Sequence, residues 1–163
     1  MVSVNRSVPR LRALLFAGLV AAGLGAGGQP LWAQATPCTF VKAADVAILL
    51  GETPIATPPG NSCAWKVAGS KRRLLVLTYS NRMPGEMLYN GAHQSAEKEP
   101  ESKFMDEAGI GDKAFSMTVP FGAMFMMLKG GRVLQLQFHT YAQGTEKDRD
   151  ALRLVARKAI AAF

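Results

Sequence analysis

Two apolar segments joined by a pair of glycines constrain the fold of this chain more than any other feature. Residues 122–129 and 132–139 are both rich in apolar side chains, and Gly130-Gly131 separates them. Two strands joined by two residues that tolerate positive φ form a β-hairpin. In the second segment apolar and polar residues alternate, so one face of that strand is predicted to be buried. The hairpin therefore predicts an antiparallel sheet.

Three further segments predict strands of the same sheet. Residues 63–67, 73–79 and 113–119 are short, largely apolar and bounded by turn residues. Residues 73–79 are apolar on both faces, which is typical of a central strand. The sequence therefore predicts about five strands, with loops over residues 53–62 and 97–112.

Three segments predict helices. Residues 146–163 carry apolar side chains at helical spacing, and Thr145 with Asp148 has the pattern of a capping box. Shorter helices are predicted over residues 40–50 and 84–98. The resulting order is α-β-β-α-β-β-β-α. It predicts an α+β fold in which an antiparallel sheet of about five strands has helices packed on one face.

The first 35 residues have the three-part composition of a secretory signal peptide. Three arginines precede the apolar residues 13–24, and small residues stand at positions 33 and 35. This order of basic, apolar and small residues is the one that signal peptidase processes. The sequence therefore predicts a signal peptide over 1–35, cleavage after Ala35, and a single exported domain over 36–163 in a periplasmic or secreted location.

An uncleaved N-terminal anchor is the alternative, because no charged residue lies between Arg12 and Lys42. Once the signal is cleaved, no membrane span is predicted. The chain has 19 basic and 12 acidic residues, and cleavage removes three arginines, which lowers the net charge from +7 to +4. A charge this small argues against a nucleic-acid partner.

The predicted domain contains two cysteines, Cys38 and Cys63. An even number of cysteines in an oxidising compartment predicts a disulfide. The alternative is a metal or redox pair, but no Cys-x-x-Cys motif occurs and no histidine lies near either cysteine in the sequence. We therefore expect one structural disulfide.

The residue types needed for catalysis do not form a recognisable motif. The two histidines, His93 and His139, lie outside any nucleophile motif, and both are predicted at the surface. The Gly109-Ile110-Gly111 segment precedes a strand instead of a helix, which favours a tight turn over a phosphate-binding loop. We therefore predict no catalytic residue, no enzymatic activity and no cofactor.

Lys71-Arg72-Arg73 is the chain's basic run, and it lies at a predicted hairpin turn. A solvated turn is one interpretation. The other is a contact with anionic lipid or an anionic polymer at the cell envelope.

The chain has eight methionines, and three of them lie together in one predicted strand. Met124 and Met126 share one face of that strand, while Phe125 and Met127 share the other. Three interpretations stay open: core packing, an adaptable surface for a ligand or partner formed by Met124, Phe125, Met126 and Met127, and a soft-metal site that binds copper through the three thioethers.

Several short motifs resemble a class of small exported bacterial domains of unknown function, many of which are actinobacterial lipoproteins. The matching segments are Cys38 to Gly51, Cys63-Ala64-Trp65, Gly109-Ile110-Gly111-Asp112-Lys113-Ala114 and the predicted helix over 146–163. The chain departs from this class because Pro37, directly before Cys38, breaks the lipobox. The resemblance implies a compact envelope domain with a disulfide and carries over no catalytic residue.

Together these features predict an exported, non-catalytic domain that binds a small ligand or an envelope protein. The loops over 53–62 and 97–112 and the methionine-rich strand are the expected recognition regions. A copper-binding protein and a small enzyme whose site the sequence does not reveal are the alternatives.

Overall fold

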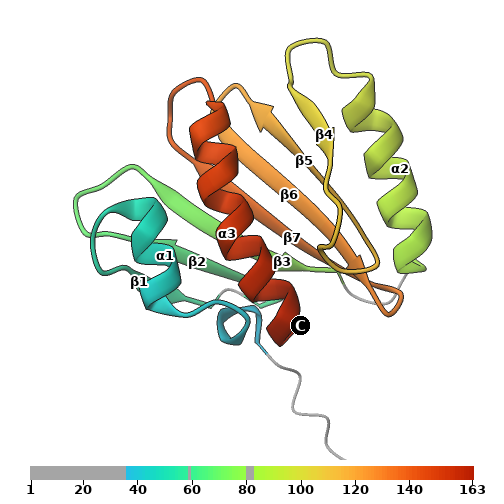
Figure 1. Ribbon diagram of the computed structural model, residues 1–163. Helices are drawn as coiled ribbons and strands as arrows, with labels where there is room; N and C mark the ends of the chain where they lie inside the picture. Colours follow the sequence, from blue (N-terminus) through green and yellow to red (C-terminus); the bar gives the residue numbers. More distant parts are fainter. Residues whose placement is uncertain (1–35, 59, 80–82) are drawn as a thin grey trace, which may run out of the picture. The chain divides into compact units, whose positions relative to one another are not determined.

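The computed structural model describes residues 36–58, 60–79 and 83–163. The predicted signal peptide and its cleavage point lie outside these residues. The described part is an α+β fold built on one antiparallel sheet, with strand order β1-β2-β3-β7-β6-β5-β4 (Figure 1). The strands are β1 (Ile55–Thr57), β2 (Ser62–Lys66), β3 (Arg73–Thr78), β4 (Phe104–Asp106), β5 (Lys113–Val119), β6 (Gly122–Lys129) and β7 (Arg132–His139).

The α+β class is confirmed, but the predicted number of about five strands is wrong, because the described residues form seven. The two additional strands, β1 and β4, are three residues long and lie at the two edges of the sheet. Their segments carry proline or charged residues and are too short to show a period of two, so the sequence predicted loops there. Backbone pairing with β2 and β5 holds them in place instead.

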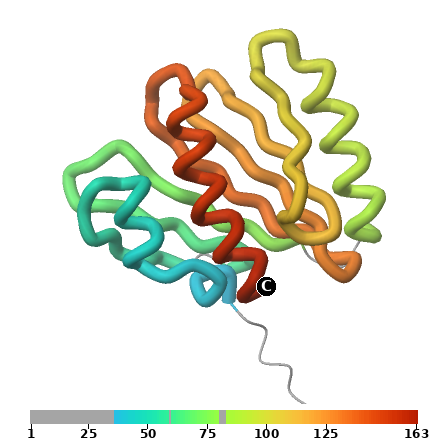
Figure 2. Tube along the Cα trace, viewed as in Figure 1, coloured from blue at the N-terminus to red at the C-terminus, as the bar shows by residue number. Residues whose placement is uncertain are grey.

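The helices are α1 (Ala43–Leu50), α2 (Gly85–Glu97) and α3 (Glu146–Ala162), preceded by the 3₁₀ turn η1 (Pro37–Thr39). The capping box predicted for the last helix is present, since Thr145 Oγ1 accepts a hydrogen bond from the Asp148 backbone and the Asp148 side chain accepts one from the Thr145 backbone. In Figure 1 and Figure 2, α1 and α3 lie in front of the sheet, and the C-terminal end of α3 lies near η1.

The prediction that the helices pack on one face is wrong, because α1 and α3 cover one face and α2 covers the other. Phe125 and Met127 of β6 belong to the core under α1 and α3, whereas Met126 of the same strand packs with Tyr89 of α2. Neighbouring residues of a strand point to opposite faces. Because β6 is apolar on both faces, both faces of the sheet require a covering layer.

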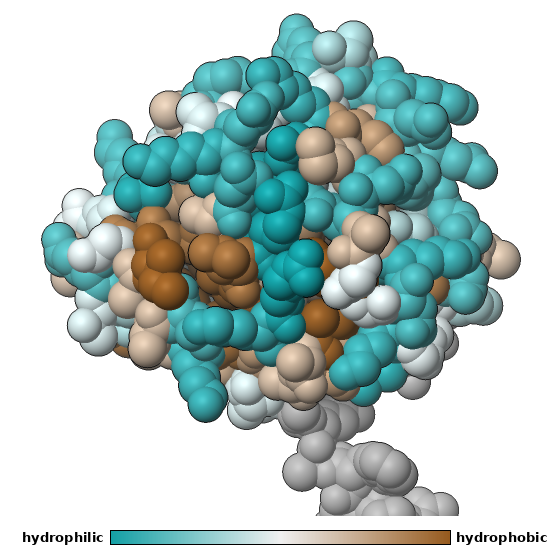
Figure 3. All heavy atoms as spheres, in the orientation of Figure 1, coloured by the Kyte–Doolittle hydropathy of each residue, from teal (hydrophilic) through white to brown (hydrophobic). Residues whose placement is uncertain are grey.

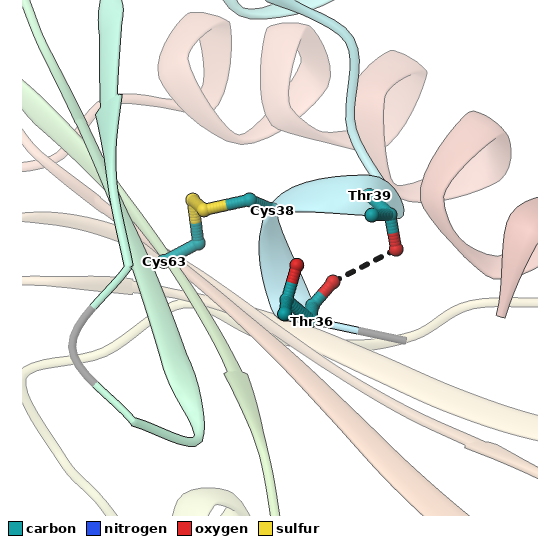
Figure 4. Close-up of a disulfide and its surroundings, with 4 residues drawn as sticks. All are labelled: Thr36, Cys38, Thr39 and Cys63. Atoms are coloured by element: carbon teal, nitrogen blue, oxygen red, sulfur yellow. Dashed lines mark hydrogen bonds between the residues drawn. A yellow bond between two sulfur atoms is a disulfide. The ribbon is translucent and has the colours of Figure 1, made fainter. Parts of the chain in front are cut away.

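A disulfide joins η1 to β2. Cys38 and Cys63 are bonded at an S–S distance of 2.04 Å, which confirms the predicted pair (Figure 4). Beside the bridge, Thr39 Oγ1 donates a hydrogen bond of 2.8 Å to the Thr36 carbonyl, which closes the η1 turn (Figure 4). The bridge attaches the start of the described chain to the sheet.

Apolar side chains also reach the surface on the side of α1 and α3. Figure 3 shows brown, hydrophobic atoms over α1 within a mostly hydrophilic surface. Ile48 of α1 and Leu154 of α3 are more than half exposed. Within the described residues, no helix combines the length and apolar character that a membrane span needs.

Candidate functional site

An open pocket of about 400 Å³ lies between α2 and the edge of the sheet formed by β4 and β5. Helix α2 contributes one wall, and the other wall follows the end of β4 into the start of β5. The segment 106–108, within the predicted recognition loop 97–112, lies in this wall. Besides two alanines, the pocket is lined by Tyr89, Asn90, His93, Asp106, Glu107 and Lys113.

His93 and Asp106 are hydrogen-bonded at the mouth of the pocket. The distance from His93 Nε2 to Asp106 Oδ1 is 2.8 Å, and the side chains are 26% and 72% exposed. The imidazole also packs edge-on against Phe104 and Phe115, with ring centroids 4.9 Å and 5.5 Å away. These contacts hold the ring in one plane while the carboxylate binds one of its nitrogens.

The sequence placed His93 on the outer surface of a helix and missed this arrangement. His93 and Asp106 are 13 residues apart, on different elements, and only the packing of α2 against β4 and β5 brings them together. The available signal was Phe104 within the charged segment 97–107, because burial of its ring against another element is favourable.

Tyr89 forms the buried side of the pocket. It is 3% exposed, and its ring packs edge-on against Phe115 at 5.5 Å. Burial, and next the negative charge of Asp106, raise the pKa of Tyr89 to about 12. The phenol therefore keeps its proton at physiological pH and offers a hydrogen-bond donor.

Glu107 anchors the end of β4 to α3. It is 8% exposed, and Arg153 donates to both of its carboxylate oxygens, from Nε at 2.7 Å and from Nη2 at 2.8 Å. Ser116 Oγ donates a third bond of 2.6 Å. Burial alone would raise the pKa of Glu107, but the hydrogen bonds and the positive charge of Arg153 hold the pKa below its usual value. The paired carboxylate fixes the backbone beside Asp106.

The pocket rim carries charges of both signs. Lys113 Nζ lies 3.2 Å from Glu86 Oε2, and both side chains are about half exposed at 48% and 59%. An ammonium, a carboxylate, an imidazole and the Asn90 amide thus surround an opening above apolar side chains. Such a rim can pair with the charged or polar groups of a small molecule. The lining residues include no serine, threonine or cysteine, so His93 has no conventional nucleophile beside it there.

The methionine-rich strand β6 does not form one exposed surface. Phe125, Met126 and Met127 are at most 3% exposed, and only Met124 of the four predicted residues is half-buried. Its sulfur accepts a hydrogen bond of 2.7 Å from Gln135. Met127 lies on the face opposite Met124 and Met126, so the three thioethers cannot bind one ion together. The described residues also hold no group of three or more His, Cys, Asp or Glu that fits a metal.

His139, the second histidine, lies far along the sheet from the pocket, at the end of β7 beside Arg73 of β3. Burial, and next the charge of Arg73, lower the pKa of His139. His139 is not among the residues that line the pocket.

Comparisons of the chain with protein-family models, with curated proteins and with solved structures gave no match. The resemblance to small exported domains therefore stays a prediction, and the site is interpreted from its own geometry.

Proposed function

We propose that this chain is an exported binding domain that takes a small polar ligand into the pocket between α2 and β4. The observation that carries the proposal is the placement of His93, Asp106, Asn90 and Lys113 around one opening of about 400 Å³. This volume is in the range of small-molecule sites, which combine an apolar lining with a few fixed polar groups.

The polar groups of the pocket are held by contacts within the protein, which favours recognition. His93 is fixed by two aromatic rings and Asp106. The neighbouring Glu107 is locked to Arg153. A ligand that meets preorganised groups loses less entropy of ordering on binding. The mixed charges of the rim favour a ligand that carries both a cationic and an anionic or carbonyl group.

The test compares two carboxylate variants of the chain recovered without denaturation from an exporting host. Asp106→Asn removes the pocket charge, whereas Glu146→Gln is the matched control, because Glu146 is also an exposed carboxylate paired with a single partner. Native mass spectrometry is expected to show a small passenger on the wild type and on Glu146→Gln, and its loss from Asp106→Asn.

If the wild type is recovered without a passenger, a second measurement tests whether the pocket binds a small polar ligand. Amino acids, dicarboxylates and diamines are titrated in turn while backbone amide NMR shifts are recorded. We expect one class to move the amides of residues 89–93 and 106–113. The proposal fails if every probe leaves these amides unchanged, or if Asp106→Asn and the control behave alike.

A second candidate function rests on the His93–Asp106 pair alone. An imidazole bound to a carboxylate can act as a general base that activates water. Hydrolysis of a panel of esters, amides and phosphate esters would then fall in His93→Gln at unchanged folding. A chain without hydrolytic activity toward the whole panel supports the binding function instead.

A further inference from the structure

One end of the sheet gathers unpaired positive charge. Lys66 and Arg73 face each other across β2 and β3, and the turn between these strands adds Lys71 and Arg72. None of the 12 acidic residues of the chain lies in segments 53–85 or 113–145, which contain β1–β3 and β5–β7. Among the described residues, none of the four cations makes an ion pair, and the Arg72 guanidinium lies 5.0 Å from the centre of the Phe138 ring.

Exposed aromatic side chains lie at the same end. Phe121 in the β5–β6 turn is 62% exposed, and Tyr141 directly after β7 is 53% exposed. The Thr140 backbone N–H donates to the Phe121 carbonyl at 2.8 Å, which keeps the two segments together. The Arg73 guanidinium lies 5.9 Å from the centre of the Tyr141 ring, so cations and aromatic rings form one surface. We call the surface of Lys66, Lys71, Arg72, Arg73, Phe121 and Tyr141 the cationic–aromatic end.

The backbone segments that carry Phe121 and Tyr141 are closely packed against each other. A Cβ atom on Gly144 would lie 1.6 Å from the Gly122 carbonyl oxygen, so the segment after β7 sits directly on the β5–β6 turn. Tyr141 has a φ of 59°, and no other non-glycine residue among those described has a positive φ. Residues held in such sparsely populated backbone conformations cluster at functional sites. The Tyr141 ring is exposed to solvent and does not belong to the hydrophobic core.

The acidic residues that begin α3, near this end, already have partners. Glu146 pairs with Lys103 at 2.9 Å, Asp150 pairs with Arg153 at 2.5 Å, and Asp148 caps the helix. These carboxylates are therefore partly neutralised. The positive charges of the β2–β3 turn are not.

We infer that the cationic–aromatic end binds the surface of an anionic phospholipid bilayer. Basic side chains are attracted to anionic headgroups, and aromatic side chains favour the boundary between headgroups and acyl chains. Both kinds of side chain are present here on neighbouring turns at one end of a rigid sheet. A soluble polyanion would engage the cations but would leave the exposed Phe121 ring without a role. The inference is independent of the pocket, which lies at the β4 edge of the sheet.

The experiment is co-sedimentation of the chain with lipid vesicles. The protein is recovered from an exporting host, so that wild type and variants share one N-terminus and any contribution of residues 1–35 cancels. One set of vesicles is phosphatidylcholine, and the other contains equal parts of phosphatidylcholine and phosphatidylglycerol. We expect tighter partitioning to the anionic vesicles, and a loss of this preference at high salt because ions screen surface charge.

Two double variants test the two parts of the surface. Each basic residue near an anionic surface contributes roughly fivefold to partitioning, so Lys71→Gln with Arg73→Gln is expected to weaken it by roughly 25-fold. Phe121→Ser with Tyr141→Asn is expected to weaken partitioning to anionic vesicles as well. Asparagine tolerates positive φ better than tyrosine, so the second change should not strain the backbone.

The matched controls lie elsewhere on the surface. Met87→Ser with Leu154→Ser removes two apolar side chains of similar exposure, at 61% and 55%. Lys98→Gln with Arg157→Gln removes two exposed charges outside the cationic–aromatic end. Both controls are expected to partition like the wild type. Thermal unfolding identifies any variant that fails to fold.

Three outcomes would overturn the inference. The first is equal partitioning to neutral and anionic vesicles, and the second is an equal effect of the variants and their controls. The third concerns binding to a heparin fragment. If Lys71→Gln with Arg73→Gln weakens this binding, and Phe121→Ser with Tyr141→Asn leaves it unchanged, the surface binds a soluble polyanion. If a double variant does not fold, the wild type is instead mixed with vesicles that contain spin-labelled phosphatidylglycerol, and its backbone amide NMR signals are recorded. The amide signals of residues 121 and 141 should broaden, and those of α2 should not.

Discussion

The buried ion pair between Glu107 and Arg153 is predicted to stabilise the pocket edge of the sheet. Removing one partner of a buried pair commonly costs about 3–5 kcal/mol, because the other charge is left without a partner in a poorly solvated place. Here Arg153 is 23% exposed and keeps Asp150 at 2.5 Å. We therefore expect Glu107→Gln to lower the free energy of unfolding by about 2 kcal/mol, below the usual range.

A double-mutant cycle isolates the pairwise part of this energy. Glu107→Gln, Arg153→Met and the combined variant are unfolded in urea with the disulfide intact. The coupling energy is expected to be about 2 kcal/mol, since the two side chains share two hydrogen bonds. The control cycle uses Lys113 and Glu86, whose exposed pair is expected to couple by about 0.5 kcal/mol or less.

The same pair predicts a pH dependence with a definite sign. The pKa of Glu107 is lowered in the folded chain, so its contribution is present above the unfolded pKa of about 4.3 and is lost as pH falls through the folded value. The stability difference between wild type and Glu107→Gln should therefore be constant near neutrality and shrink in acid. A coupling energy no larger than that of the exposed control, or a difference that grows in acid, would refute the reasoning.

Three further predictions concern the framework of the site. Replacing Cys38 and Cys63 by alanine opens a loop with a sequence separation of 25 and is expected to lower the unfolding free energy by about 3.5 kcal/mol in urea melts. Gly122→Ala should prevent native folding, as judged by the NMR spectrum, because a Cβ there would lie 1.8 Å from the Phe138 carbonyl oxygen; a native spectrum contradicts this. Tyr141→Asn alone should raise the melting temperature slightly, because it relieves the backbone strain at a φ of 59°; a clear decrease would show that the ring stabilises the fold.

Local patterns in the sequence predicted the centre of the fold correctly. The hairpin at Gly130-Gly131 is present, with Lys129 paired to Arg132, and so is the capping box of α3. These features depend on residues that are neighbours in the chain, so their signal is complete within a short window. The disulfide was also predictable, because two cysteines allow only one intramolecular bridge.

The edges of the sheet and its second helical layer were not predictable in this way. Strands β1 and β4 are strands only because β2 and β5 supply hydrogen-bond partners. The placement of α2 on the opposite face follows from both faces of β6 being apolar. That pattern was visible as the uninterrupted apolar run over residues 123–128, but such a run does not say which helix covers which face.

By itself the sequence determined the α+β class, the central antiparallel strands, the last helix and the cysteine pair. The tertiary structure alone decided the candidate site. His93 meets Asp106 across 13 residues, and Glu107 meets Arg153 across 46. The cationic–aromatic end likewise joins Arg73 to Tyr141. Such contacts depend on how helices and strands pack against one another, which no local spacing encodes. For this protein, therefore, the fold could be predicted largely from neighbouring residues, whereas the pocket and the cationic–aromatic end depend on residues that only folding brings together.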